Sequence, residues 1–341
     1  MSKVNVLIVG ATGYIGIQLV KLLNKHKKVN IKYLCGSSNV GKKLIHFDKS
    51  FNSKKLPKIV KFNKKFLKNV DVIFTALPNG QSQKISKYLL KKNVLIDLSA
   101  DFRLRKSIDF QKWYKIKHKA KNLIEKSVYA IPEIKGSLIK NYPIISCPGC
   151  YPTSILLPLI PLIKNNLIDN KNIIIDSKSG YSGAGRSIHK RYENKNLYES
   201  LSAYGLAVHR HNSEIQQELD LNTSKKNMFQ FTPHLSPMFR GILSTIYLDL
   251  KKKVNQAMIN SCLRKFYKNK KFVKITKLNR FLGTNDVINT NKCIISVCKS
   301  KYKDKVIILS AIDNLIKGGS GQAVQNMNIL YNFKEDEGLN V

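Results

Sequence analysis

The sequence predicts an α/β fold in which a doubly wound parallel sheet fills the first half of the chain and a second domain with further strands follows. Apolar runs of strand length alternate with helical runs through that first half, as in parallel sheets covered by helices on both faces. A glycine-rich turn joins the first strand to the first helix. At 341 residues with 43% hydrophobic content, the chain is long enough for two cores.

The first strand and its turn predict a dinucleotide site. Residues 3–9 form an apolar strand, Gly10-Ala11-Thr12-Gly13-Tyr14-Ile15-Gly16 follows, and a helical run continues through Leu23. Glycines at these points allow a tight turn, a close approach of the backbone to a pyrophosphate, and packing of the helix on the strand. We expect cofactor contacts from Gly10, Thr12, Gly13, Tyr14, Ile15 and Gly16. The Gly-x-x-Gly-x-x-Gly spacing is also compatible with an ordinary glycine-rich turn.

The second strand indicates which dinucleotide is bound. Residues 30–34 end in Cys35-Gly36-Ser37-Ser38, and no Asp or Glu stands where an acceptor for a ribose 2′-hydroxyl is expected. Ser37, Ser38 and the following Lys42-Lys43 suit a 2′-phosphate, which favours NADP(H) over NAD. The alternative is that the two lysines belong to a surface rich in lysine.

Two further strands follow in the same pattern. Residues 70–76 and 94–98 are apolar strands separated by a predicted helix over 81–91. Ser99-Ala100-Asp101-Phe102-Arg103 then stands at the carboxyl end of the later strand. Ligands bind at that edge of open parallel sheets, so we expect this segment to lie near a ligand.

A candidate nucleophile lies in Cys147-Pro148-Gly149-Cys150-Tyr151-Pro152-Thr153. This heptapeptide follows a short strand at 144–145 and opens an apolar helix through 155–163. Cys150 then faces unpaired backbone N–H groups at the positive end of the helix dipole, which favours the thiolate. A buried structural cysteine and a Cys147–Cys150 dithiol remain alternatives. The other cysteines form no second close pair, so structural zinc is not expected.

The second half supplies possible partners for the thiol. The loop Ser179–Arg186 follows an apolar strand at 172–176, and its glycines and serines can present donors to an anion or form a flexible surface turn. His209-Arg210-His211 precedes a helical run at 215–221. In an extended segment the two histidines point to opposite sides, one toward the site and one toward a scaffold or Glu214. Histidine is the usual acid–base partner of a catalytic thiol, and no third metal ligand is evident.

The remaining segments predict loops around two strands. Residues 232–235 and 237–241 form a proline-punctuated loop before a strand at 242–250, with Arg240 as its notable charge. After a strand at 306–312, Asp313-Asn314 and Gly318-Gly319-Ser320-Gly321 lead into a helix over 322–330. The glycines and Asn314 either touch a cofactor or cap the helix.

Charge and composition limit the partners. The formal net charge is +39, but only 8 of the 60 basic residues are arginines and the lysines are dispersed, which argues against a specific nucleic-acid reader. No apolar run reaches about 18 residues and no signal-peptide pattern opens the chain, so neither a membrane span nor secretion is expected. Six cysteines in a chain of this length do not form a disulfide scaffold, and a cytoplasmic setting fits.

Eight collinear segments resemble the N-acetyl-γ-glutamyl-phosphate reductase family, which belongs with aspartate-semialdehyde dehydrogenase in a wider group. They are Gly10–Gly16, Ser99–Arg103, Tyr129–Glu133, Pro148–Thr153, Ser179–Arg186, His209–His211, Thr232–Arg240 and Asp313–Asn328. The resemblance implies a Rossmann-type NADP-binding domain over 1–149, an α+β catalytic domain over 150–313, and a C-terminal helix over 314–341 that returns to the first domain. Families of this design are often dimers or tetramers.

The resemblance also implies an activity. It is the NADPH-dependent reduction of N-acetyl-L-glutamyl 5-phosphate to the semialdehyde and phosphate in arginine biosynthesis, with Cys150 as nucleophile and His209 as acid–base. Arg210, Arg240, Arg186 and Ser179 are candidates for substrate binding, Gly183 and Asn314 for cofactor binding, and no metal is expected. An aspartyl- or aminoadipyl-phosphate reductase, or a non-catalytic NADP- or polyanion-binding protein, remain alternatives.

Two departures from the family pattern stand out. Cys147 occupies a position where relatives more often carry Asn or an apolar residue, which leaves open a regulatory disulfide with Cys150. Ser213-Glu214 stands where Pro-Glu is common, which should alter only the entry to the following helix.

Overall fold

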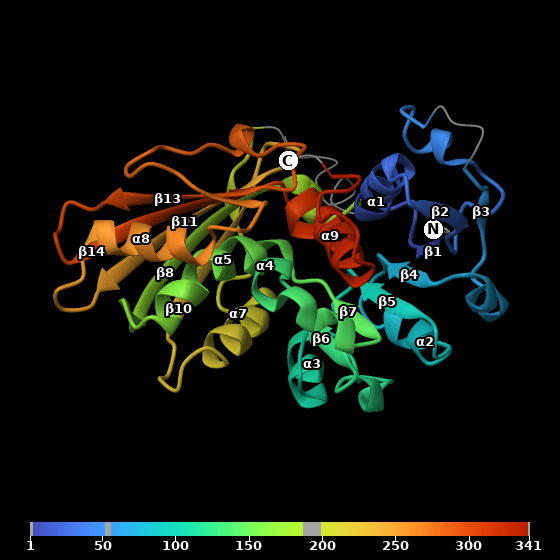
Figure 1. Cartoon of the computed structure of the whole chain (residues 1–341), viewed down its shortest axis with the longest axis horizontal. Coiled ribbons are helices and arrows are strands. Elements are labelled where there is room, and N and C mark those ends of the chain that lie inside the picture. The colour runs from blue at the N-terminus through green and yellow to red at the C-terminus, as the bar shows by residue number, and fades with distance from the viewer. Residues whose placement is uncertain (1–2, 52–55, 187–198, 340–341) are drawn as a thin grey trace. The chain divides into compact units, whose positions relative to one another are not determined.

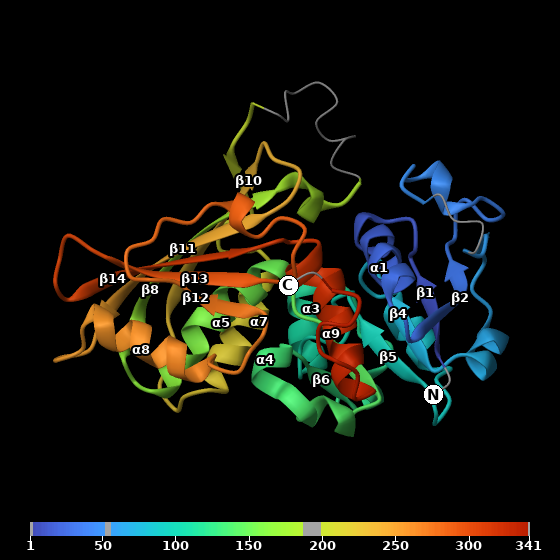
Figure 2. The same ribbon diagram turned by 45° about the horizontal axis from the view of Figure 1, so that its top comes forward.

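The computed structural model describes residues 3–51, 56–186 and 199–339, which form two compact units. Within these residues, the first unit runs to Pro148 and resumes at Gly319, and the second runs from Gly149 to Gly318. Figures 1 and 2 show the elements of both. Within the described residues, no helix is long and apolar enough to cross a membrane.

The first unit contains a fully parallel, seven-stranded sheet in the order β3-β2-β1-β4-β5-β7-β6. Its strands are β1 (Val4–Val9), β2 (Val29–Cys35), β3 (Ile59–Val60), β4 (Val72–Thr75), β5 (Val94–Asp97), β6 (Ser127–Tyr129) and β7 (Ile144–Ser146). Its helices are α1 (Tyr14–Lys25), α2 (Ser82–Ser86), α3 (Ser107–Tyr114), α4 (Pro132–Lys135) and α9 (Gly321–Leu330). The strand order reverses between β1 and β4, so the predicted doubly wound sheet is confirmed and its switch point lies there.

Helix α9, at the end of the chain, packs beside α1 and α4 of the first unit. Buried polar side chains form hydrogen bonds at these contacts, which offset the free-energy cost of removing them from water. His26 Nε2 lies 2.9 Å from Asn328 Oδ1, and Gln325 donates to Glu133 Oε1 at 2.8 Å. Amide side chains on α9 therefore tie the C-terminal segment to the N-terminal half.

The second unit contains a mixed seven-stranded sheet in the order β12-β13-β14-β11-β8-β10-β9. Its strands are β8 (Ile168–Gly180), β9 (Ser202–Ala203), β10 (Phe229–Ser236), β11 (Ile242–Leu250), β12 (Val273–Ile275), β13 (Cys293–Lys299) and β14 (Lys305–Ile312). Its helices are α5 (Cys150–Lys164), α7 (His211–Asp220) and α8 (Gln256–Phe266). Helix α5 is almost entirely apolar and packs on β8, β11 and β14, so it forms the centre of this unit's core.

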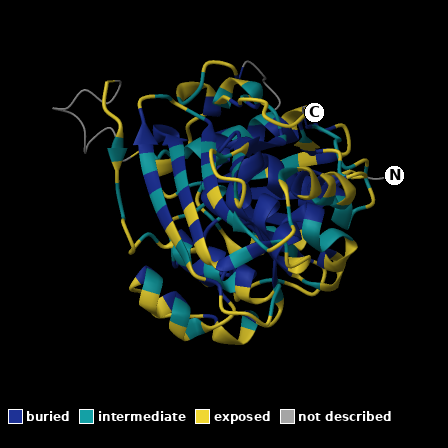
Figure 3. Cartoon of the chain, turned by 90° about the vertical axis from the view of Figure 1, so that its left-hand side faces the viewer, coloured by how far each residue is buried: buried dark blue, intermediate teal, exposed yellow. Residues whose placement is uncertain are grey.

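Burial alternates along the strands of this second sheet, as Figure 3 shows. In β8, Ile173 and Ile175 are buried while Ile174 is exposed. Tyr247 of β11 pairs with Ile174 and is also exposed. Because cross-strand partners share a face, one face of the sheet presents large apolar side chains to the outside.

Several predicted boundaries were wrong. Residues 232–235, predicted as loop, lie in β10, where Pro233 is tolerated close to the sheet edge because the next strand, β9, has only two residues. The helix predicted over 81–91 is confined to Ser82–Ser86. Strand β8 extends to Gly180 and takes in Ser179. A π-helical turn at Ile316–Ser320 was not predicted.

Candidate active site

The glycine turn of the first unit is shaped by close backbone packing. Gly10 has a positive φ of 89°, and a methyl group on it would lie 2.8 Å from the carbonyl carbon of Ala76. A methyl on Gly16 would lie 2.9 Å from Ala11 Cα. Gly13 precedes α1, and its would-be methyl meets only the Gly10 carbonyl oxygen, at 3.7 Å. Gly10 and Gly16 are thus required by the fold, whereas Gly13 leaves the helix N-terminus open to an anion.

The predicted 2′-phosphate residues lie beside this turn. The Gly10 N–H donates to the Cys35 carbonyl at 2.9 Å, so the end of β2 touches the turn directly. Ser37 and Ser38 follow and are exposed, while Thr12, Tyr14 and Ile15 are partly exposed at the start of α1. These predicted cofactor residues of the first unit therefore gather at one edge of its sheet.

Cys150 is the first residue of α5, with Gly149 as the helix N-cap. The position predicted for the thiol is confirmed. A methyl on Gly318 would lie 2.7 Å from Cys150 Cβ, so the π-helical turn packs directly on the cysteine. Because Gly149 and Gly318 have no side chains, the His211 ring can pack on Gly149 and the backbone at Gly318 can pack on Cys150.

Cys147 lies in a different environment from Cys150. It is buried in the first unit, Asn326 Nδ2 lies 3.8 Å from its Sγ, and burial raises its pKa to about 12. Cys150 is partly exposed, and the two cysteines are not joined by a disulfide. A protonated, buried thiol is a poor nucleophile, so the two cysteines of the Cys-x-x-Cys pair are not equivalent.

The two histidines do not diverge as predicted. Arg210 between them has helical dihedrals (φ −57°, ψ −27°), and His211 already opens α7. The segment is therefore not extended, and the two ring centroids lie 4.7 Å apart. The prediction that one histidine faces Glu214 holds for His211, whose Nε2 lies 3.7 Å from Glu214 Oε1.

His211 and Glu214 both contact the residue before the nucleophile. A methyl on Gly149 would lie 2.7 Å from His211 Cε1, so the imidazole stacks directly on this glycine. The Gly149 N–H donates to Glu214 Oε2 at 2.9 Å, and Glu214 is fully buried. One buried carboxylate thus holds both an imidazole and the backbone that carries Cys150. The signal in the sequence was a histidine three residues before a glutamate at a helix start, which places both on one face.

His209 lies within a cluster of aromatic rings that includes Tyr151, the residue after Cys150. Its ring lies 5.7 Å from that of Tyr151 and 5.4 Å from that of Tyr204. Its Nδ1 accepts the His211 backbone N–H at 3.1 Å. Burial, with a smaller effect from the charge of Arg210, lowers the pKa of His209 to about 4. His209 is therefore neutral at physiological pH.

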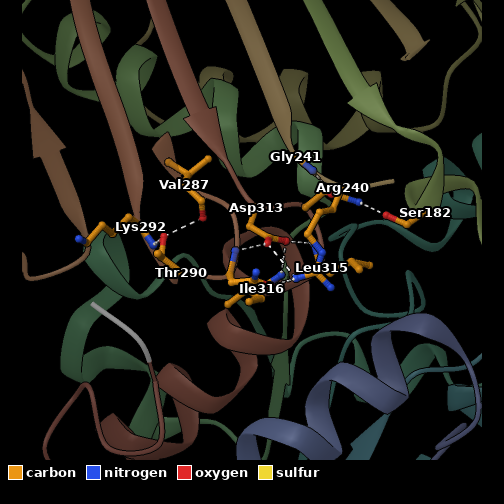
Figure 4. A network of polar contacts seen from close by, with 11 residues as sticks. Ser182, Arg240, Gly241, Val287, Thr290, Lys292, Asp313, Leu315 and Ile316 are labelled. Carbon is orange, nitrogen blue, oxygen red and sulfur yellow. Dashed lines mark hydrogen bonds and ion pairs between the residues drawn. The ribbon is translucent and has the colours of Figure 1, made fainter. Parts of the chain in front are cut away.

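A buried carboxylate that was not singled out for the site, Asp313, organises a network of polar contacts among loops of the second unit, as Figure 4 shows. Asp313 Oδ2 pairs with Arg240 Nη1 at 3.2 Å, and Oδ1 accepts the N–H groups of Leu315 (2.9 Å) and Ile316 (3.2 Å). Arg240 also donates to Asn289 at 2.5 Å. Asp313 therefore balances the charge of Arg240 and fixes the turn that leads to Gly318.

Asn314 joins two loops of the same unit. Its Oδ1 accepts the Gly241 N–H at 2.7 Å, and its Nδ2 donates to Ser182 Oγ at 3.0 Å. A methyl on Gly183 would lie 3.2 Å from Ser179 Oγ, so Ser179, Gly183 and Asn314 are brought together.

The other two predicted arginines, Arg186 and Arg210, are exposed on this unit. Among the described residues, no group of three or more His, Cys, Asp or Glu side chains could hold a metal ion.

This arrangement matches a known class of enzyme. Residues 5–142 match the family model "Semialdehyde dehydrogenase, NAD binding domain", and residues 150–314 match "Semialdehyde dehydrogenase, dimerisation domain". Aspartate semialdehyde dehydrogenase II from Vibrio cholerae shares the fold, with a TM-score of 0.71 and 15% identity over 97% of this chain and 99% of that one. The enzyme from Candida albicans, solved with NADP, has a TM-score of 0.68 and 17% identity over 97% and 99%. The chain therefore has the fold of the semialdehyde dehydrogenases.

Sequence relatives narrow this class. N-acetyl-gamma-glutamyl-phosphate reductase from Desulforamulus reducens is 43% identical over 98% of both chains. The enzyme of that name from Thermoanaerobacter pseudethanolicus is 45% identical over 99% of this chain and 98% of its own. The chain belongs to the N-acetyl-gamma-glutamyl-phosphate reductase family, and the predicted resemblance is confirmed.

Proposed function

We propose that the protein reduces N-acetyl-L-glutamyl 5-phosphate to N-acetyl-L-glutamate 5-semialdehyde and phosphate with NADPH, as a cytoplasmic step of arginine biosynthesis. The observation that carries this proposal is Cys150, placed at the start of α5 beside the His211–Glu214 pair in a chain of this reductase family. An acyl phosphate fits the chemistry of a thiolate, because phosphate is a good leaving group and a thioester accepts hydride readily.

The Cys150 thiolate attacks the acyl carbonyl, and the bond from the acyl carbon to the phosphate oxygen breaks. Phosphate departs, and the acyl group remains on Cys150 as a thioester. NADPH, when bound, supplies the hydride that reduces this thioester. The oxyanion then takes a proton from a neighbouring acid, and collapse of the thiohemiacetal returns that proton and releases the aldehyde and the Cys150 thiolate. Backbone N–H groups at the start of α5 are placed to stabilise the oxyanion.

The contacts of His211 support an acid–base role better than those of His209. Its ring lies on Gly149 and is paired with the buried Glu214, an arrangement that orients an imidazole for proton transfer. His209, the residue favoured from the sequence, has its pKa lowered to about 4, so its conjugate acid is scarce at neutral pH. We therefore propose His211 as the acid–base and His209 as part of the aromatic wall around Tyr151.

Cofactor binding is proposed for the edge of the first unit. Gly10, Thr12, Gly13, Tyr14, Ile15 and Gly16 would hold the pyrophosphate, and Ser37 and Ser38 the 2′-phosphate. The open N-terminus of α1 at Gly13 supports this assignment. In the second unit, Gly183 remains a proposed cofactor contact. Asn314 would act through the two loops that its amide joins.

Substrate anions require cationic partners. Arg186 and Arg210 are exposed and are proposed to bind the carboxylate and the phosphate. Arg240 is already paired with Asp313, so we propose that it donates to the substrate from a fixed position without adding net charge. Ser179, buried at the end of β8, is proposed to complete this group.

A homo-oligomer is also proposed. The match to a dimerisation domain covers residues 150–314. The exposed Ile174 and Tyr247 lie on one face of the second sheet, where a second copy would bury them. Light scattering of the protein and of a Tyr247→Lys variant would test that face, with loss of the dimer expected in the variant.

The matched variants Cys150→Ser and Cys147→Ser test the proposed chemistry. We expect Cys150→Ser to lower the rate by about 10⁴-fold or more, as for removal of a catalytic nucleophile. Cys147→Ser should leave most of the activity, because its thiol is buried and protonated. Peptide mass mapping after incubation with the acyl phosphate but without NADPH should place the acyl group on the peptide containing Cys150. Full activity in Cys150→Ser, or faster turnover of aspartyl or aminoadipyl phosphate, would contradict the proposal.

A further inference from the structure

The loop after β4 lies at the switch point of the first sheet. Strands β1 and β4 are neighbours, and the Ala76 N–H donates to the Val9 carbonyl at 2.9 Å where both strands end. The site of a Gly10 methyl would lie 3.4 Å from Leu77 Cδ2. The loop that begins at Leu77 is therefore adjacent to the glycine turn, on the edge where a dinucleotide binds.

Asp101 holds this loop through both of its carboxylate oxygens. Oδ1 accepts the Gly80 N–H at 2.6 Å, and Oδ2 accepts the Gln83 N–H at 3.0 Å. Asp101 is 1% exposed, so both bonds are shielded from water. Gly80 has a φ of +82°, and this left-handed turn directs its N–H to the carboxylate. The carboxylate thus fixes the loop at two points three residues apart.

Asp101 is itself held in place from a third segment. His118 Nδ1 accepts the Ala120 N–H at 3.2 Å, so its Nε2 carries the proton and donates to the Asp101 carbonyl at 2.8 Å. The Gln83 side chain accepts the Lys119 N–H at 2.6 Å. Ser99 adds a weaker contact, accepting the Leu77 N–H at 3.2 Å. The loop is thus tied to the segment after β5, and Asp101 is its only charged acceptor among these contacts.

We propose that Asp101 is a positioning residue for the dinucleotide, which fixes residues 77–83 in the conformation that faces NADPH. Asp101 is buried behind the loop, so it acts through the loop backbone and not by contact with the cofactor. This role of Asp101 rests on the proposed binding of NADPH at this edge. Loss of the carboxylate is expected to weaken cofactor binding while leaving the chemistry at Cys150 intact.

Asp101→Asn and the matched control Asp71→Asn test this role. Asp71 also accepts a backbone N–H, that of Asn5 at 2.9 Å, but it lies just before β4, at the opposite end of that strand. In Asp101→Asn, one oxygen becomes an NH₂ group that opposes a backbone donor. We expect KM and Kd for NADPH to rise about tenfold, for a loss of about one hydrogen bond to a charged group. The kcat at saturating NADPH and the KM for the acyl phosphate should stay within about twofold, and Asp71→Asn should change neither KM.

A milder variant covers the case in which Asp101→Asn fails to fold. Ser99→Ala removes only the acceptor of the Leu77 N–H and should raise the KM for NADPH about two- to threefold. Unchanged NADPH affinity in both variants, or an equal rise in the KM for both substrates, would overturn the role of Asp101. Failure of the unaltered protein to bind NADPH in the same titration would instead contradict the proposed function.

Discussion

The cofactor edge of the first unit and the thiol site of the second are built in different ways. At the cofactor edge, backbone meets backbone, since Gly10 and Gly16 lie where any side chain would collide with a neighbouring main chain. At the thiol site, side chains from separate elements converge. His211 and Glu214 of α7 contact Gly149, and Asp313 fixes the turn that leads to Gly318. The cofactor edge can therefore be recognised in the sequence from its glycine spacing, whereas the residues of the thiol site are scattered along the chain.

This difference determines how each region should respond to substitution. Where main chain packs on main chain, an added methyl group acts on folding first, because backbone cannot move aside cheaply. Where side chains orient a reacting group, a substitution acts on the rate, because the fold has other support. Three predictions test this contrast.

The largest effect is expected at His211. His211→Asn should lower kcat about 10²- to 10⁴-fold, the contribution of a positioned acid–base, and leave the KM for NADPH unchanged. The matched variant His209→Asn should cost less than about tenfold, because that imidazole is neutral and encased by rings. Steady-state kinetics over pH 6–9 measure both, and the limb of the pH profile that reports the acid–base should vanish only in His211→Asn. A larger loss in His209→Asn would restore the prediction made from the sequence.

Five of the seven strands of the first unit could be predicted from the sequence, and the short strands β3 and β6 were not predicted. Val4–Val9, the glycine turn and the helix from Tyr14 follow from apolar runs and glycine spacing, which are local properties of the chain. Cys150 at a helix start was equally local, because Pro148-Gly149 and Pro152 mark that boundary. The loop predicted at 232–235 was wrong because the rule that proline disrupts a sheet is also local. It takes no account of the neighbouring strand β9, which has only two residues.

The residues alone could not rank the partners of Cys150, and the choice of His209 rested on the family resemblance. His209 and His211 are two residues apart, and only the helical backbone at Arg210 decides that both rings lie beside the nucleophile loop. Asp313 was given no role in the interpretation of the sequence, and its ion pair with Arg240 spans 73 residues of sequence. Contacts of that range depend on the packing of the second sheet, which no spacing encodes.

Next in size is the contrast between two glycines of the cofactor edge. Gly16→Ala should destabilise the protein by about 3 kcal/mol, because a methyl there would press on the Ala11 backbone at 2.9 Å. Gly13→Ala should leave the stability within about 0.5 kcal/mol, since its methyl has ordinary contact and its φ of −72° suits alanine. The same methyl would stand where a pyrophosphate approaches the helix, so NADPH affinity should fall in Gly13→Ala. Urea unfolding and NADPH titration measure the two effects, and equal stabilities would show that Gly16 is not required by packing.

The smallest effect is expected in the pH dependence of the unfolding free energy, to which His209 at the thiol site contributes. The pKa of His209 is lowered to about 4 in the folded protein, chiefly by burial, whereas in the unfolded chain it is near 6.5. Between these values only the unfolded chain takes up the proton, so stability falls as the pH falls from about 6.5 to about 4. His209→Phe keeps an aromatic ring among Tyr151, Tyr204 and Phe231 but cannot be protonated. The difference in unfolding free energy between His209→Phe and the unaltered protein should therefore grow by about 2–3 kcal/mol from pH 7 to pH 4.5, since each pKa unit is worth about 1.4 kcal/mol. Charges elsewhere contribute equally to both proteins and cancel, so a difference that stays constant with pH would show that the His209 ring is accessible to protons in the folded state.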